Sequence, residues 1–297
     1  MEVWAAIIAR NESTEIAGCL DSVRGADGVA LVDTGSEDDT LDMARLWATS
    51  SGTRMEILEI PWEDDFSSAR NAASSLAESC GADWVMHIDA DMRLSGGGME
   101  AVRAACGSEG GRTMNVLQKS PCGRFSNSRP MLHRPGERWS GRIHESLPRN
   151  ESPPPAGVEM VYGRSKSHER DPGRNLRILR RDASENPSPR IFYYLGSELY
   201  DRGEVHEAYF WFEKCARSSN FRGERADARL FMAKILWIQC LGSLAREQCM
   251  KSIGEVPDSR EALLWMAKMS FEREAAVWRR FAESAGNEGV VFVRPVA

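Results

Sequence analysis

The sequence lacks any apolar run long enough to cross a membrane, and no basic leader precedes its first short apolar run, Val3–Ala9. A transmembrane helix needs about 20 consecutive apolar residues, and a secretory signal needs a positively charged start. We therefore expect a cytoplasmic protein that has no membrane partner.

The sequence also lacks any pair of cysteines separated by two residues. Its seven cysteines are an odd number and lie far apart, at positions 19, 80, 106, 122, 215, 240 and 249. This pattern is typical of a reducing cytosol, in which thiols serve as small apolar residues, and it gives no indication of a zinc site.

The composition is that of a soluble globular protein, with 42% hydrophobic and 28% charged residues in a chain of 297. This length suits one large domain or two medium ones. The net charge of −6 is unevenly distributed: residues 119–181 carry 14 basic against 6 acidic residues, and the rest carry 24 against 38. The basic segment could face a phosphate-bearing substrate or an acidic acceptor, or it could be a solvated surface.

The first 95 residues predict an α/β fold. Strands are expected at residues 3–9, 29–32, 55–60 and 84–88, and helices at 13–23, 38–48 and 66–80, with Ser13 as a possible N-cap. This alternation predicts βαβ units and a mostly parallel sheet. From 95 to 185 the pattern loosens into long loops, with a helix near 99–106 and strands at 113–118 and 130–134, as in an acceptor-side subdomain.

From about residue 187 the chain is expected to be all helical, so we predict an α/β domain at 1–185 and a helical domain at 186–297. A tetratricopeptide-like pattern is formed by Phe192, Leu195, Gly196, Leu199, Ala208 and Phe212. A second copy aligns Met232, Ala233 and Ala245 and ends at Pro257, and a third covers 259–285. A plain helical bundle is the alternative, and in either case these helices would bind or brace rather than catalyse.

The most informative motif is Asp89-Ala90-Asp91, which directly follows the apolar strand expected at 84–88. Two carboxylates at this spacing lie at the carboxyl edge of the sheet, where ligands bind in open α/β folds. Hard oxygen ligands suit Mg²⁺ or Mn²⁺, and such an ion suits a diphosphate. Taken alone, the motif could equally be an acidic loop.

Further polar clusters accompany this motif. They are ARNE at residues 9–12, VDTGSEDDT at 32–40, DFSSARN at 65–71 and WSGRIHE at 139–145. The first three lie at strand ends or at the helix starts that follow, so we expect them to share one crevice with the paired aspartates. Structural alternatives exist for each: Asp33 could form a turn, Ser67 could cap a helix and Arg70 could be a surface charge.

In this order, the motifs resemble those of family 2 glycosyltransferases of the GT-A fold, over roughly residues 3–181. The helical repeats resemble the tail of a subgroup that includes bacteriocin S-glycosyltransferases. The resemblance implies a nucleotide-diphosphate sugar donor, a UDP-sugar before others, a Mn²⁺ or Mg²⁺ ion and transfer with inversion. Departing from the usual family pattern, the chain has no HxGY-like stretch near residue 168.

Site roles follow from this resemblance, position by position. Asp33 would bind the base, Ala9 and Glu12 would line the base and ribose, and Arg70 would contact the base or diphosphate. Asp91 would ligate the metal directly, Asp89 would face the ribose and metal, and His168 would complete the metal shell unless it is an exposed histidine in a basic loop.

An inverting transfer needs a base that takes the acceptor's proton. Glu145 is the candidate, and His144 would orient the acceptor or polarise Glu145; alternatively, the two are a structural pair that holds their loop. Trp139 is a candidate to stack on a sugar ring. His87, inside the expected strand, should be a buried, hydrogen-bonded core residue.

Other functions stay open. A nucleotidyltransferase could use the same carboxylates, but no glycine-rich, lysine-bearing phosphate loop lies near the first strand. A non-catalytic repeat scaffold is a third possibility. Among acceptors, the repeats favour a protein or peptide. A glycan is the alternative that the resemblance implies, and the basic segment keeps a modified DNA base open.

Overall fold

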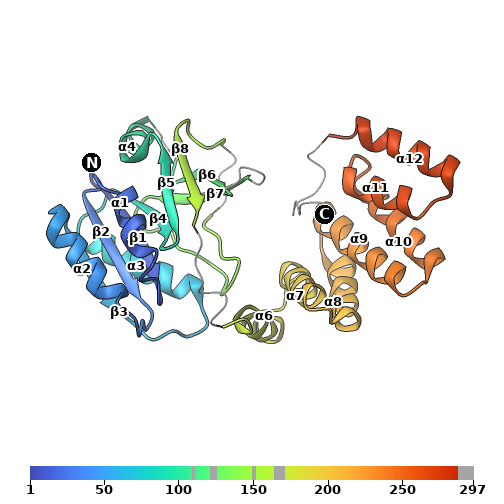
Figure 1. Ribbon diagram of the computed structural model, residues 1–297, viewed down its shortest axis with the longest axis horizontal. Coiled ribbons are helices and arrows are strands. Elements are labelled where there is room, and N and C mark those ends of the chain that lie inside the picture. The colour runs from blue at the N-terminus through green and yellow to red at the C-terminus, as the bar shows by residue number, and fades with distance from the viewer. Residues whose placement is uncertain (109–110, 121–125, 149–151, 164–170, 287–297) are drawn as a thin grey trace. The chain divides into compact units, whose positions relative to one another are not determined.

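The computed structural model describes residues 1–108, 111–120, 126–148, 152–163 and 171–286 (Figure 1). The chain divides into two compact units, Met1–Pro172 and Gly173–Ala297. Helix α6 (Arg174–Glu185) belongs to the second unit. The sequence-based domain boundary after residue 185 stays a prediction.

The first unit contains one eight-stranded sheet, in the order β3-β2-β1-β4-β7-β6-β8-β5. The strands are β1 (Val3–Ala9), β2 (Gly28–Asp33), β3 (Met55–Glu59), β4 (Trp84–Asp89), β5 (Met92–Gly96), β6 (Thr113–Lys119), β7 (Ser126–His133) and β8 (Val158–Tyr162). Strands β3, β2, β1 and β4 are parallel, and β7 runs antiparallel to both β4 and β6. The mostly parallel GT-A arrangement expected from the sequence is confirmed.

Strands β1, β2 and β4 are buried on both faces, which explains their nearly continuous apolar sequences, whereas β3 at the edge of the sheet is half-buried or exposed. In β1, Val3, Ala5 and Ile7 join one core, while Trp4 and Ala6 join the other. The first core is covered by α1 (Ile16–Ser22), α2 (Thr40–Ser51) and α4 (Gly98–Ser108), and the second by α3 (Phe66–Ser79).

Some local expectations were wrong. Helix α1 begins at Ile16 rather than at residue 13, and the amides of Glu15 and Ile16 donate to the carbonyl of Glu12, so Ser13 is not the N-cap. Helix α3 is capped by Asp65, which accepts from the amide of Ser68, rather than by Ser67. Strands β5 and β8 and helix α6 were not expected.

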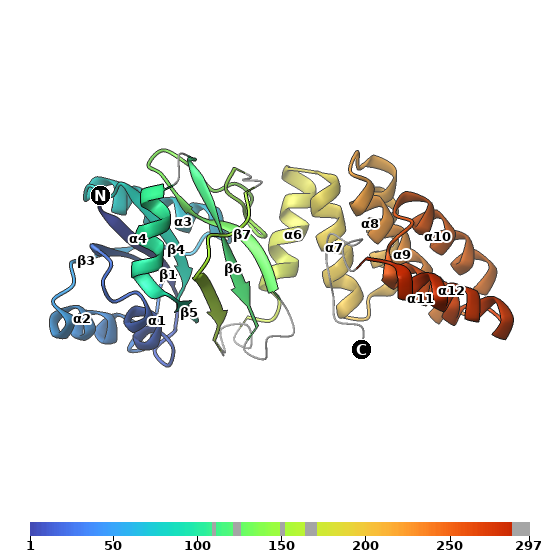
Figure 2. The same cartoon turned by 90° about the horizontal axis from the view of Figure 1, so that it is seen from above.

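The second unit is helical throughout its described residues. Its helices are α6, α7 (Pro189–Asp201), α8 (Val205–Ser218), α9 (Arg222–Ile238), α10 (Gly242–Glu255), α11 (Arg260–Lys268) and α12 (Glu272–Ser284), and successive helices pack against one another (Figure 2). The pairs α7/α8, α9/α10 and α11/α12 coincide with the three expected repeat copies. A Cβ on Gly196 would come within 3.0 Å of the Phe212 ring, so this glycine permits close packing of α7 on α8.

None of the helices in the described ranges combines the length and apolar character that a bilayer crossing requires.

Candidate active site

The carboxyl ends of three parallel strands bring the donor-side residues together. The register pairs Ala9 of β1 with Asp33 of β2, and Ile8 of β1 with Asp89 of β4. Residues that lie 24 and 81 positions apart in the sequence thus become neighbours at one edge. The expected convergence of these clusters is confirmed by the sheet.

Asp33 forms the turn that follows β2. Its carboxylate accepts from the amides of Gly35 and Ser36 at 3.0 and 2.8 Å and from the Ser36 hydroxyl. The neighbouring carbonyl of Ala9 accepts from the amide of Thr34 at 3.0 Å. The turn-forming alternative for Asp33 is therefore realised, and this network holds the strand ends together at the edge.

The turn between β4 and β5 carries the paired aspartates. Burial, together with the nearby carboxylates of Asp89 and Glu12, raises the pKa of Asp91 to about 7. Buried carboxylates gathered in this way repel one another unless a proton or a cation joins them. The turn is therefore suited to binding positive charge.

These residues fit a divalent ion. Asp89 and Asp91 offer the hard oxygen atoms that Mg²⁺ and Mn²⁺ prefer. Within the described part of the chain, no group of three or more His, Cys, Asp or Glu side chains is placed to hold an ion. The remaining ligands would then come from donor phosphates and water, as is common for Mg²⁺. His168, the third ligand expected from the sequence, lies outside the described residues.

Arg70 joins the donor-side aspartate to the predicted base. On the buried face of α3, its Nη2 lies 2.7 Å from Oδ1 of Asp89 and its Nε lies 2.7 Å from Oε1 of Glu145. Arg70 is only 4% exposed and Glu145 only 5%, so the surface-charge alternative for Arg70 is wrong. Burial lowers the pKa of the guanidinium, but the two carboxylates outweigh this effect, and the pKa lies above its usual value.

Glu145 comes from a short loop that is closed on itself. The amides and carbonyls of Ser140 and Ser146 pair in both directions at 3.0 Å. Beside Glu145, His144 has φ +52° and an exposed side chain, so the two neighbouring side chains differ in burial. Only Glu145 therefore contributes to the buried ion cluster.

Trp139 is not available to stack on a sugar. It is 3% exposed and belongs to a hydrophobic core of the unit, and the guanidinium of Arg70 lies 4.9 Å from its ring centre. The expectation of an exposed sugar platform was wrong because the indole is packed beneath the cluster. A cation over an aromatic face is stabilised by the ring quadrupole.

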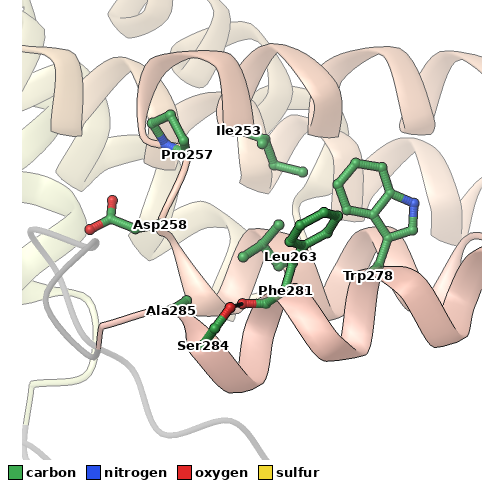
Figure 3. A pocket seen from close by; sticks show the side chains of 8 residues that line it. All are labelled: Ile253, Pro257, Asp258, Leu263, Trp278, Phe281, Ser284 and Ala285. Carbon is green, nitrogen blue, oxygen red and sulfur yellow. Dashed lines mark hydrogen bonds between the residues drawn. The ribbon is translucent and has the colours of Figure 1, made fainter.

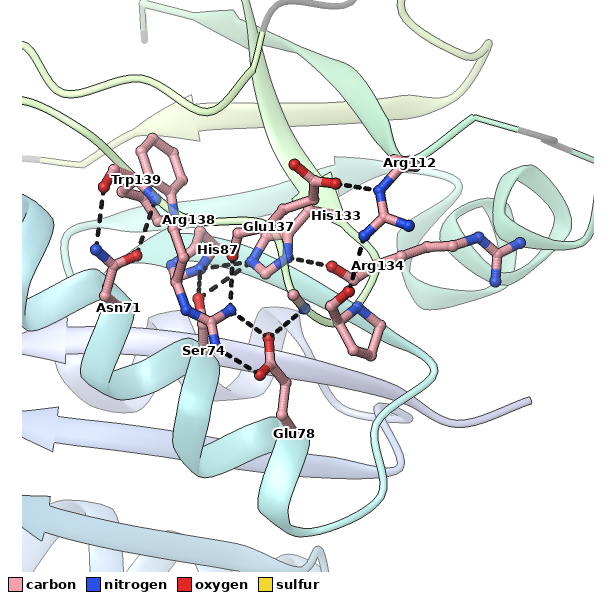
Figure 4. Close-up of polar contacts among 12 residues, drawn as sticks. Asn71, Ser74, Glu78, His87, Arg112, His133, Arg134, Glu137, Arg138 and Trp139 are labelled. Carbon is pink, nitrogen blue, oxygen red and sulfur yellow. Dashed lines mark hydrogen bonds and ion pairs between the residues drawn. The ribbon is translucent and has the colours of Figure 1, made fainter.

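A second buried polar network lies farther along α3 (Figure 4). The Ser74 hydroxyl contacts Nε2 of His87 at 2.9 Å and Nε2 of His133 at 3.1 Å, and Nδ1 of His133 lies 2.9 Å from the carbonyl oxygen of Arg134. The expectation that His87 is a buried, hydrogen-bonded core residue is confirmed. Burial lowers the pKa of both imidazoles, so the network holds them neutral at pH 7.

Many cations of the basic segment have carboxylate partners within the unit. The described ion pairs are Lys119–Glu159, Arg129–Glu145, Arg138–Glu78 and Arg142–Asp65. Four cations of the basic segment are therefore paired with carboxylates within this unit. Arg129 also donates from its Nη2 to the Glu145 carbonyl at 2.7 Å.

Several residues of the site gave no sequence signal. Asn71 donates to the carbonyl of Trp139 at 3.0 Å and accepts from its amide at 2.8 Å, which ties the loop to α3. The Tyr162 hydroxyl donates to the side chain of Gln118 at 3.0 Å. Burial raises the pKa of Tyr162, and the negative charges of Asp89 and Asp91 raise it further. These contacts join segments that are distant in sequence: Asn71 is the last residue of the motif at 65–71, but nothing in the sequence indicates its partner.

The helical unit has an apolar cavity of its own, of about 390 Å³ (Figure 3). Its lining residues come from α10, α11, α12 and the adjoining turns and are Ile253, Pro257, Asp258, Leu263, Trp278, Phe281, Ser284 and Ala285. Phe281 is 54% exposed, so the cavity has an apolar rim. The cavity lies at the small end of the range for small-molecule pockets, and its lining is mainly apolar.

Comparison with known proteins agrees with this architecture. Residues 4–106 match the family model described as glycosyl transferase family 2. A TPR repeat-containing protein of Synechococcus elongatus is 27% identical over 72% of this chain and 56% of its own length. An uncharacterized glycosyltransferase of Rickettsia conorii is 38% identical over 32% of this chain and 30% of its own length.

Among solved structures, S. aureus TarS 1–349 in complex with UDP-GlcNAc covers 96% of this chain and 91% of its own, with 13% identity and a TM-score of 0.43. Within the first unit, residues 4–106 are the part that matches the glycosyl transferase family 2 model. A tetratricopeptide-like helical region follows it. The chain spans about half the length of its Synechococcus relative and less than a third of its Rickettsia relative.

Proposed function

We propose that this chain transfers a sugar from a nucleotide-diphosphate sugar to an acceptor, with inversion at the anomeric carbon. A UDP-sugar is the favoured donor. The observation that carries the proposal is the buried contact of Arg70 with both Asp89 and Glu145. It joins the paired aspartates of the family 2 domain to a carboxylate on a separate loop, as a two-substrate reaction requires.

On the donor side, Ala9, Glu12 and Asp33 would line the base and ribose, Asp89 would face the ribose and metal, and Asp91 would bind Mn²⁺ or Mg²⁺ directly. The ion, when bound, would neutralise the negative charge that develops on the leaving diphosphate. The raised pKa of Asp91 supports this role, because a crowded carboxylate gains most from a cation.

On the acceptor side, Glu145 would take the proton of the attacking hydroxyl or thiol. The acceptor atom forms a bond to the anomeric carbon while the bond from that carbon to the diphosphate oxygen breaks on the opposite face. His144, on the same loop and exposed, would orient the acceptor. Arg70, buried between Asp89 and Glu145, would hold these two carboxylates rather than lie open to the base.

A protein or peptide is the favoured acceptor. The tetratricopeptide-like hairpins and the apolar cavity beside Phe281 support this choice, since such helical surfaces bind extended chains and anchor apolar side chains. The internally compensated cations of the basic segment speak against nucleic acid, which would need free positive charge.

The donor is tested by thermal unfolding with a panel of nucleotide sugars and Mn²⁺, since a ligand that binds the folded state raises the melting temperature. Release of the nucleoside diphosphate is then measured with the best donor. Glu145→Gln should keep the donor-induced shift but lower kcat by about 10²–10⁴-fold, the usual contribution of a general base. Arg225→Gln, which breaks an ion pair with Glu255 in the helical unit, is the matched control and should leave kcat unchanged.

The product separates the competing functions. A nucleotidyltransferase would release pyrophosphate instead of a nucleoside diphosphate. A scaffold would bind no donor, and Asp91→Ala would change nothing. Either result contradicts the proposal.

The acceptor is tested by incubating a cell extract with a radiolabelled donor and digesting the labelled material. Label that protease releases and DNase leaves intact identifies a protein acceptor. Label that DNase releases, with acceptor affinity that falls steeply with salt, identifies DNA, and label that resists both identifies a glycan.

A further inference from the structure

The guanidinium of Arg70 uses one edge to hold two carboxylates at the same time. Nε points to Glu145 and Nη2 points to Asp89, each at 2.7 Å. Nη1, on the other side of the group, is buried and has no hydrogen-bond partner among the described residues. The planar fork of arginine allows this double contact, whereas a lysine ammonium is a single point charge.

The orientation of the guanidinium is itself fixed. It lies over the ring of Trp139, and both backbone groups of Trp139 are hydrogen-bonded to the side chain of Asn71, the residue after Arg70 on α3. The loop of Glu145 is thereby held by two consecutive residues of one rigid helix. A catalytic group on a loop gains precision from such support.

Glu145 has no comparable support from its own segment. The described contacts of its side chain are to Arg70 at 2.7 Å and Arg129 at 3.9 Å, and the residue is 5% exposed. A buried carboxylate without a close cation is strongly disfavoured, so the side chain would rotate toward water if Arg70 were lost.

We propose that Arg70 is the positioning residue of the acceptor base: it holds Glu145 beside the donor-side Asp89, so that the two substrates meet at a fixed distance. The inference rests on the proposed function and assigns Arg70 a role different from direct contact with the base or diphosphate of the donor. Arg70 acts through Glu145, so its effect on transfer should exist only when Glu145 can work as a base.

A double-mutant cycle tests this dependence. Arg70→Lys should lower kcat by about 100-fold in the wild-type background, because a misplacement of about 1 Å can cost that much. In the Glu145→Gln background, the same substitution should change kcat less than about threefold, since groups that act as a unit are not additive. The donor Kd, measured by calorimetry, should change by less than about fivefold in both backgrounds.

A matched control is available on the same helix and loop. Arg138 forms a two-pronged ion pair with Glu78 of α3, at 2.7 and 2.9 Å, away from the aspartates. Arg138→Lys should leave kcat and donor Kd within about twofold of wild type, because exposed pairs contribute little. In Arg70→Ala, added guanidinium ion should restore part of kcat, while methylammonium should not.

The outcomes are distinguishable. If the wild-type chain binds and turns over no nucleotide sugar, the proposed function itself fails. If wild type is active but Arg70→Lys lowers kcat equally in both backgrounds, or chiefly raises the donor Kd, Arg70 acts on the donor and the inference is overturned. If Arg70→Lys unfolds, the kcat of Arg70→Ala with added guanidinium is the deciding measurement. A partly restored kcat supports the positioning role. An unchanged kcat in the folded variant contradicts it.

Discussion

Asp91→Asn should make the metal-free protein more stable at pH 8, although it removes a predicted metal ligand. The folded-state pKa of Asp91 is raised from 3.8 to about 7 by burial and by the carboxylates of Asp89 and Glu12. Because this pKa is raised, the contribution of Asp91 to the free energy of unfolding is fully present below about pH 4 and is lost as the pH rises through 7. The asparagine carries no charge and avoids this loss.

The magnitude follows from the shift. One pKa unit corresponds to about 1.4 kcal/mol, so ionising Asp91 costs the fold roughly 4 kcal/mol, which its partial exposure to solvent reduces to roughly 2–4 kcal/mol. In a domain of this size, we expect Asp91→Asn to raise the melting temperature by roughly 5–10 °C at pH 8 in EDTA. At pH 4, the variant and wild type should unfold together.

The assay is calorimetric or circular-dichroism melting at pH 4 and pH 8, with EDTA or with Mn²⁺. Mn²⁺ should raise the melting temperature of wild type at pH 8 but not that of Asp91→Asn. Asp42→Asn, at an exposed position on α2, is the control and should change little. A variant that is less stable than wild type at pH 8 in EDTA, or that Mn²⁺ stabilises equally, would refute this reasoning.

The remaining predictions concern the buried histidines and a crowded glycine. The folded-state pKa values of His87 and His133 lie below 6.5, so their contribution to stability is present above about pH 6.5 and is lost as the pH falls, by at most about 1.4 kcal/mol per pH unit for each. In the Asp91→Asn background, His133→Gln should flatten the urea-unfolding free energy between pH 7 and 5, and an unchanged slope would contradict the neutral network. A Cβ at Gly163 would lie 2.0 Å from the carbonyl oxygen of Asp91, so Gly163→Ala should cost about 2 kcal/mol or more and weaken donor binding, whereas Gly254→Ala, in open space on α10, should not destabilise. Equal melting temperatures for the two alanine variants would show that the turn moves freely.

Strands β1, β2 and β4 could be predicted because they are buried on both faces and consist of apolar runs. Strand β5 could not, since only Met92 and Leu94 of its five residues are buried and its partner β8 lies more than 60 residues away. Helix α6 was missed because its arginines conceal a narrow buried stripe at Ile178 and Leu179. A strand that is buried on both faces has a continuous apolar sequence, whereas a strand that is buried on one face has a weaker pattern.

The candidate site, too, could be predicted from the sequence only in part. The positions of Asp33 and Asp89 follow from strand ends in a parallel sheet, so they could be predicted before any coordinates. The partner of Arg70 could not, because Glu145 is 75 residues away on a loop that no periodicity describes. Trp139 was a wrong candidate for sugar stacking for the same reason. The burial of an aromatic residue in a loop depends on a helix that lies far away in the sequence.

Helix α3 shows why this loop is nevertheless well defined. Along its length, the helix contacts the segment 133–145 at five places, through Phe66 to Arg142, Arg70 to Glu145, Asn71 to Trp139, Ser74 to His133 and Glu78 to Arg138. A rigid helix sets the spacing of these contacts, so loosening one of the four inner contacts changes the geometry at the others, whereas the more exposed Glu78–Arg138 pair contributes little. Substitutions at Ser74 should therefore alter transfer without touching either substrate, because the buried histidine network and the predicted base are held by the same helix.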